Sequence, residues 1–189
     1  MKGLSEDKFL IMYHGGLMPE RGIEGLIYTL TLNEGVYLFL LGNGTANYIA
    51  DLNELAKREG VRDRVCIHDA VDHNELWKYA GAADVGMITI RASWKSYYYM
   101  LPNKLFENIQ AETPVICSNF PAVQKMVKTY QVGLTCDPEK TEDINRCIMR
   151  FKSDDKFYRD CMIHIREAKK ELCWEREKEV LKDAYRRIL

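Results

Sequence analysis

Residues 8–16 read KFLIMYHGG, an apolar run that ends in a histidine and two glycines. A continuous apolar run of this length is typical of a strand that is buried on both faces, as in a parallel sheet. The glycines predict a tight turn directly after it. We therefore expect a buried first strand at residues 8–13, followed by a turn at residues 14–16.

The same unit recurs along the chain, because short apolar runs alternate with segments of helical periodicity. Strands are expected at residues 8–13, 36–41, 65–67, 84–90, 114–117 and 133–136. Helices are expected around residues 23–30, 46–58, 76–79, after 102, at 121–127, and from 141 to the end. This alternation predicts an α/β fold with a doubly wound, six-stranded parallel sheet, Rossmann-like, with extra C-terminal helices.

Composition narrows the class of protein. The 189 residues, 47% hydrophobic and 29% charged, suit a single globular domain. A net charge of −1 predicts no nucleic-acid partner. The six cysteines form no CxxC pair and the four histidines are scattered, so we expect reduced thiols, no metal site and a cytoplasmic location. Polar residues follow Lys2 and the apolar runs are strand-length, so no signal peptide and no membrane insertion are expected.

A second informative segment is YYYMLPNKLFE at residues 97–107. Proline is favoured in the first turn of a helix, so we expect a helix that starts near Pro102. The amides of Asn103 and Lys104 would then be free to bind an anion, which the helix dipole and the lysine charge favour. A carboxylate one turn further in, at Glu107, suits a sugar hydroxyl. The alternative is a solvated polar face on which Lys104 and Glu107 pair at i, i+3.

The rest of this segment has two expected faces. The helix carries a polar stripe of Asn103, Glu107 and Gln110 opposite an apolar face of Leu105, Phe106 and Ile109. The tyrosine run at residues 97–99 either forms a wall over a ligand or is a partly exposed aromatic loop that packs against another domain.

Two other glycine turns follow predicted strands and fall on the same edge of the sheet. The pair Gly15-Gly16 permits the close backbone approach that phosphate loops need, although any tight turn uses it as well. Arg21 can reach the same point or can be an ordinary surface arginine. The turn at residues 42–44 lacks the GxGxxG spacing, and no GxxxxGK[ST] occurs, so a plain turn is preferred and a P-loop NTPase is excluded. His14 is interpreted as scaffold.

These motifs occur in order along nearly the whole chain: Tyr13–Leu17 with Arg21-Gly22, Leu40–Gly44, Val65–Val71, Leu76–Val85, Pro102–Glu107, Thr113–Ser118, Gly133-Leu134 and a closing helix from Trp174 to Tyr185. Together they resemble the C-terminal, donor-binding domain of retaining, group 1 (family four) glycosyltransferases with the GT-B fold. Each motif is weak by itself, and the resemblance depends on their order and spacing.

The resemblance implies a nucleotide-diphosphate sugar as donor substrate, such as a UDP or GDP sugar, and a retaining transfer that requires no metal or other cofactor. It implies that Glu107 holds the ribose hydroxyls, that backbone at Val71 meets the base, and that the glycine turn and the start of the helix meet the diphosphate. The implied catalytic residues are Arg21 and Lys104. The implied donor-binding residues are Gly15, Gly16, Val71, Tyr99, Leu101, Pro102, Asn103 and Glu107.

Two positions depart from the family pattern. Many members carry an E-x7-E pair whose first glutamate contacts the transferred sugar, and Tyr99 stands at that position here. Many members also have an arginine where this chain has Gly16, so Arg21 and Lys104 would carry more of the phosphate charge.

The family has two Rossmann-like domains, and the 189 residues supply one. The resemblance therefore implies a missing N-terminal, acceptor-binding half, to which any peripheral membrane association would belong. Either Met1 begins a truncated chain or the partner half is a separate polypeptide, and the isolated domain is expected to be inactive. Two other functions stay open: half of a GT-B sugar-nucleotide epimerase, and a non-catalytic nucleotide-sugar-binding module.

Overall fold

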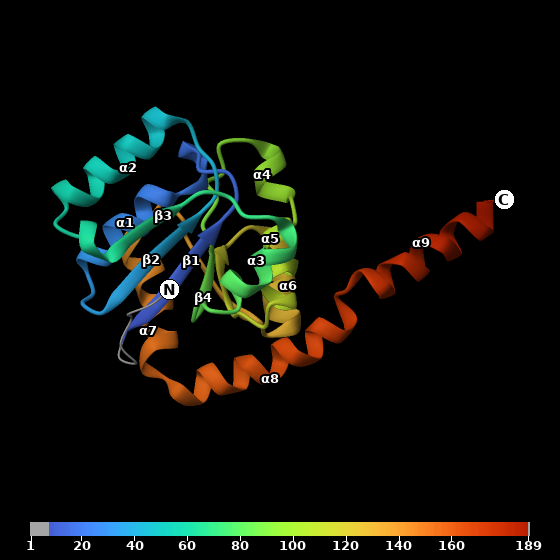
Figure 1. Cartoon of the computed structure of the whole chain (residues 1–189). Helices are drawn as coiled ribbons and strands as arrows, with labels where there is room; N and C mark the ends of the chain where they lie inside the picture. The colour runs from blue at the N-terminus through green and yellow to red at the C-terminus, as the bar shows by residue number, and fades with distance from the viewer. Residues whose placement is uncertain (1–7, 189) are drawn as a thin grey trace.

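The computed structural model describes residues 8–188. Its centre is a parallel sheet of six strands in the order β3-β2-β1-β4-β5-β6 (Figure 1). The strands are β1 Phe9–His14, β2 Val36–Leu41, β3 Val65–His68, β4 Val85–Ile88, β5 Val115–Ser118 and β6 Gly133–Cys136. The order reverses beside β1, because the chain first builds outward through β2 and β3 and then returns to place β4 on the other side of β1.

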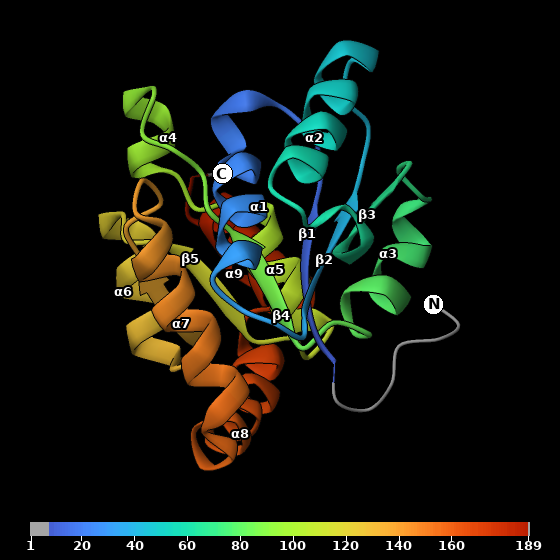
Figure 2. The same cartoon turned by 90° about the vertical axis from the view of Figure 1, so that its left-hand side faces the viewer.

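Helices cover both faces of the sheet, with α1 and α7 packed together on one face and α3 and α5 on the other (Figure 2). The helices are α1 Ile23–Thr31, α2 Ala46–Arg58, α3 His73–Ala80, α4 Lys95–Tyr99, α5 Asn103–Gln110, α6 Pro121–Tyr130, α7 Thr141–Ser153, α8 Asp155–Glu171 and α9 Trp174–Ile188. Two 3₁₀ turns complete the described elements, η1 Pro19–Arg21 and η2 Arg62–Arg64.

The residue alternation of β1 explains why this strand is apolar throughout. Ile11 and Tyr13 join the large core that α1 covers, whereas Leu10 and Met12 join a smaller core under α3. Successive side chains of a strand point to opposite faces, so a strand covered on both sides must be apolar at every position. The predicted doubly wound, Rossmann-like parallel sheet is therefore confirmed.

One detail differs from the sequence expectation, and three other points concern the C-terminal region, membrane-spanning helices and the N-terminus. The tyrosines at residues 97–99 are not a loop but the end of a short helix, α4. The C-terminal region from residue 141 divides into the three helices α7, α8 and α9. No helix within residues 8–188 is long and apolar enough to cross a membrane. The expectation about a signal peptide concerns residues that lie outside the described part.

The last helix, α9, extends away from the body of the molecule (Figure 1). None of its described residues is buried, and Trp174, Val180 and Tyr185 are among its exposed apolar side chains. By contrast, α8 buries Cys161, Ile165 and Ala168. The packed part of the chain therefore ends with α8.

Candidate functional site

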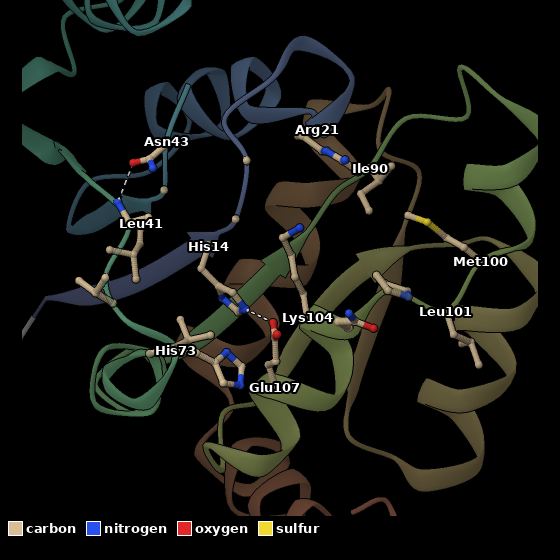
Figure 3. Close-up of a pocket in the computed structure, with 18 residues that line it drawn as sticks. His14, Arg21, Leu41, Asn43, His73, Ile90, Met100, Leu101, Lys104 and Glu107 are labelled. Atoms are coloured by element: carbon tan, nitrogen blue, oxygen red, sulfur yellow. Dashed lines mark hydrogen bonds and ion pairs between the residues drawn. The ribbon is translucent and has the colours of Figure 1, made fainter. Parts of the chain in front are cut away.

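A cavity of about 670 Å³ opens at the carboxyl ends of β1 and β2, where the strand order reverses (Figure 3). Ligands of open α/β sheets bind at this position. Nine of the predicted site residues line it: Gly15, Gly16, Arg21, Val71, Leu101, Pro102, Asn103, Lys104 and Glu107. The fold thus brings together residues from four separate segments of the sequence.

The glycine turn after β1 forms one wall of the cavity. Gly15 has φ +117°, which favours glycine, and a Cβ there would lie 2.5 Å from Cε of Lys104. The buried Tyr13 hydroxyl donates to the Gly16 carbonyl at 2.8 Å and so holds the turn from below. The positive φ is what calls for glycine here, and the flexible end of the lysine side chain lies against its backbone.

Two cations, Arg21 and Lys104, converge on this wall (Figure 3). The Arg21 Nε is buried with no hydrogen-bond partner among residues 8–188, and its guanidinium lies 5.1 Å from the centre of the Tyr97 ring. The Lys104 Nζ lies 5.3 Å from the Tyr13 ring centre. Burial, and then the charge of Arg21, lower the pKa of Lys104 to about 8. An anion in the cavity would oppose both burial and the charge of Arg21, and would therefore raise the pKa of Lys104.

Helix α5 begins at the opposite wall. Pro102 is its N-cap residue, with φ −75° and ψ 140°, and the first intrahelical bond runs from Leu105 N to the Pro102 carbonyl. Because of their position, the amides of Asn103 and Lys104 have no carbonyl one turn earlier to bond. The positive end of the helix dipole thus lies beside the two cations.

Glu107, one turn into α5, meets the end of β1. Its Oε2 lies 2.9 Å from Nε2 of His14, a contact marked in Figure 3. The hydrogen bond from His14 is the main cause that lowers the pKa of the Glu107 carboxyl, which is therefore ionised at neutral pH. The alternative of a Lys104–Glu107 pair is wrong for the described residues, because the glutamate pairs with His14 instead.

The expected polar stripe of α5 is divided between two partners. Gln110 does not share the site with Glu107, because its side-chain amide donates to the carbonyls of Lys169 and Leu172 at 3.1 and 2.9 Å. These groups lie at the end of α8, where helix carbonyls lack intrahelical partners. Gln110 therefore fastens α5 to α8.

Tyr99 is the one predicted site residue outside the cavity lining. Its side chain is 67% exposed on α4, and its ring packs edge-on against Tyr98 with 5.1 Å between centres. A contact between Tyr99 and a ligand stays a prediction, since the ring stands outside the cavity in this structure.

A third region of the cavity surrounds Val71 and Leu76, which pack against the smaller apolar core. Asn43 stands beside them and accepts a hydrogen bond from the Ala70 amide at 3.0 Å through Oδ1. The turn at residues 42–44 is thereby tied to the loop after β3. This region offers an apolar surface with a few fixed polar groups, which suits a flat ring.

Nine further residues line the cavity without having been predicted as site residues: His14, Leu41, Gly42, Asn43, Ala70, His73, Leu76, Ile90 and Met100. His14 and Leu41 end strands, two lie on α3 and the other five lie in turns or loops, and for most of them nothing in the sequence separates a lining residue from its neighbours. His14 is the exception, because a histidine that ends an apolar strand and precedes a glycine turn is a visible signal.

The cavity as a whole can hold an extended, partly anionic molecule. Arg21, Lys104 and the α5 amides supply positive charge at its centre, and Glu107 supplies an acceptor for hydroxyl groups. Among residues 8–188 no cluster of three His, Cys, Asp or Glu side chains is arranged to hold a metal ion. The six cysteines are free, and four of them are buried.

Solved structures share this fold. Sucrose-phosphate synthase from Thermosynechococcus elongatus matches 96% of this chain with a TM-score of 0.84 at 24% identity, and this match covers 46% of that chain. HepE of Anabaena, in complex with UDP and glucose, matches 95% with a TM-score of 0.79 at 15% identity, again over 49% of its own length.

Sequence comparison finds related proteins as well. A D-inositol 3-phosphate glycosyltransferase of Xylanimonas cellulosilytica is 37% identical over 44% of this chain. An uncharacterized glycosyltransferase of Methanocaldococcus jannaschii is 27% identical over 80% of it. The matches cover 21% and 38% of those two relatives. The family model for glycosyl transferases group 1 matches residues 2–168, and the chain belongs to this family.

Proposed function

We propose that this chain is the donor-binding half of a retaining glycosyltransferase, which takes a sugar from a nucleotide-diphosphate sugar. The acceptor-binding half would lie outside the chain, in keeping with matches that cover about half of each solved chain. The implied donor is a UDP or GDP sugar, and the anomeric configuration would be retained.

One observation carries the proposal. Arg21 and Lys104 approach the same point from different elements, and no carboxylate of residues 8–188 lies within ion-pair distance of either. Placing two cations in a partly buried cavity with no carboxylate paired to either is unfavourable, so the site is suited to a ligand that brings negative charge. A helix N-terminus next to a glycine turn is a favourable place for phosphate groups, and both line this cavity.

The chemistry of transfer gives these groups a role. Negative charge grows on the departing nucleoside diphosphate as the bond to the sugar breaks. Arg21, Lys104 and the start of α5 line the same cavity, so they would stabilise that charge in the transition state. Glu107 would hold the ribose hydroxyls equally in ground and transition states, and would therefore act on donor affinity.

The test is calorimetric titration of UDP and GDP into the wild type and into Glu107→Ala. We expect the tighter nucleotide to lose about tenfold in affinity, the value of one charged hydrogen bond. Glu75→Ala is the matched control, since this glutamate is a surface partner of Lys78 outside the cavity. Equal affinity of Glu107→Ala and Glu75→Ala for both nucleotides would contradict the ribose role.

A further inference from the structure

The Glu107 carboxylate is held through one oxygen only. Oε2 accepts a hydrogen bond from His14 at 2.9 Å, and within residues 8–188 no donor bonds Oε1. Because an ionised carboxylate only accepts hydrogen bonds, the imidazole carries its proton on Nε2. The His14 side chain is 5% exposed and that of Glu107 is 22% exposed. One oxygen is therefore fixed by a buried ring, and the other remains available to the cavity.

Lys104 makes this arrangement unexpected. It precedes Glu107 by three residues on α5, the spacing at which oppositely charged side chains commonly pair. In the structure the lysine instead lies against the Gly15 backbone and the Tyr13 ring. The carboxylate turns the other way, toward the end of β1 (Figure 3). Two opposite charges thus stand one helical turn apart without forming an ion pair.

We propose that His14 is a positioning residue that keeps Glu107 away from Lys104, an inference that rests on the proposed function. With Glu107 anchored, its free oxygen can accept hydrogen bonds from adjacent hydroxyls of a ribose. Lys104 meanwhile keeps its charge for a diphosphate. In this assignment His14 contacts neither the ribose nor the diphosphate, and it acts only through the Glu107 carboxylate.

The consequence of losing the imidazole follows from the helix geometry. A Glu107 side chain released from β1 falls back on Lys104, and the pair then competes with the ligand at both ends. The contact of Glu107 with the ribose hydroxyls and part of the attraction of Lys104 for the diphosphate are then lost together. Glutamine at position 14 would still present an N–H donor at about the reach of the imidazole Nε2, so it would preserve the arrangement.

The experiment is a calorimetric series on the whole chain. The probes are UDP and GDP, with the 2′,3′-dideoxy analogue of whichever binds more tightly. The variants are His14→Leu, His14→Gln, Glu107→Ala and His14→Leu with Glu107→Ala, each checked for folding by urea denaturation. We expect His14→Leu to weaken the nucleotide about tenfold and to erase the preference over the dideoxy analogue. His14→Gln should stay within about threefold of the wild type.

The double variant separates positioning from a general structural role. If His14 acts through Glu107, His14→Leu costs no further affinity in the Glu107→Ala background. The proposal is overturned if His14→Leu binds like the wild type, if its loss persists without Glu107, or if His14→Gln binds as weakly as His14→Leu. If the wild type does not prefer the nucleotide over its dideoxy analogue, the ribose role of Glu107 is refuted. The positioning role of His14, which depends on it, is then refuted as well.

Discussion

Arg21 and Lys104 are two cations that the fold leaves without a carboxylate partner among residues 8–188. The two differ chemically, because a guanidinium stays charged at any ordinary pH whereas a buried ammonium can lose its proton. Burial beside Arg21 holds the pKa of Lys104 at about 8 in the free protein. The charge available to an anionic ligand therefore depends on pH through Lys104.

Affinity for a nucleoside diphosphate should fall as the pH rises above about 8. A bound diphosphate raises the pKa of Lys104, so above about 8 binding must take up the proton that the free protein has lost. The limiting slope is about tenfold per pH unit for a single proton. Titrations between pH 7 and 9.5, in buffers of different ionisation enthalpy, measure both the slope and the proton uptake.

Lys104→Met is the control for this dependence. It should bind more weakly at pH 7 and show little further decline above pH 8, since the titrating group is gone. Constant wild-type affinity across the range, with no proton uptake, would show that the lysine does not contact the phosphate.

The glycine turns after β1 and β2 are built against each other. A Cβ on Gly42, where φ is +152°, would lie 1.9 Å from the Gly15 carbonyl oxygen. The Gly15 amide in turn donates to the Leu41 carbonyl at 2.8 Å. The turn at residues 42–44, which the sequence predicts to be a plain turn, thus supports the wall of the cavity. It fixes where the Gly15-Gly16 backbone can lie.

Gly42→Ala should destabilise the protein by about 2–3 kcal/mol, because a backbone turn has to move to admit the methyl group. Gly60→Ala is the matched control. Gly60 also has a positive φ, +68°, but nothing lies within 4 Å of its added Cβ. It should cost about 1 kcal/mol, the strain of the left-handed region alone. Urea denaturation of both variants measures the difference, and equal losses would show that the contact with Gly15 can relax.

The whole chain consists of a packed α/β body and a projecting helix, α9. The body buries side chains as far as α8, and α9 buries none among its described residues. The chain spans less than half the length of the curated relatives it matches. Folding of the body and binding in the cavity should therefore be independent of α9.

Deletion of residues 174–189 should change the free energy of unfolding by less than about 0.5 kcal/mol, as for ordinary surface changes. Nucleotide affinity should stay within about twofold. A longer deletion, from residue 155, removes the buried side chains of α8 and is expected to unfold the domain. A loss of more than about 1 kcal/mol on the shorter deletion would show that α9 packs against the body.

The fold could be predicted because most strands are continuous apolar runs and many of the turns between elements contain glycine or proline. The helix that starts at Pro102 was equally visible for the same local reason. What sequence could not reveal was which polar residue meets which. Gln110 and Glu107 share one stripe of α5, yet one bonds α8 and the other bonds β1. Such partners depend on how the helices and strands pack together. The spacing of residues within one helix does not predict that packing.

Buried polar side chains were hidden for a related reason. Asn108 is 1% exposed, and it fits against β4 only because Gly86 has no side chain there. Phe106, which the sequence places on the apolar face of α5, is only half-buried. A glycine inside an apolar strand is the signal for such a close approach, but it does not name the residue that approaches.

The place of His14 at the end of β1 has a consequence for the timescale of the site. β1 pairs with β2 along its whole length and with β4 at Ile11 and Met12, so it has no free edge near its centre. Amide hydrogens on such a strand exchange with solvent only through the rarest, most global openings of a protein. The backbone that carries His14 should therefore hold its position as long as the protein stays folded, whether or not the cavity is occupied.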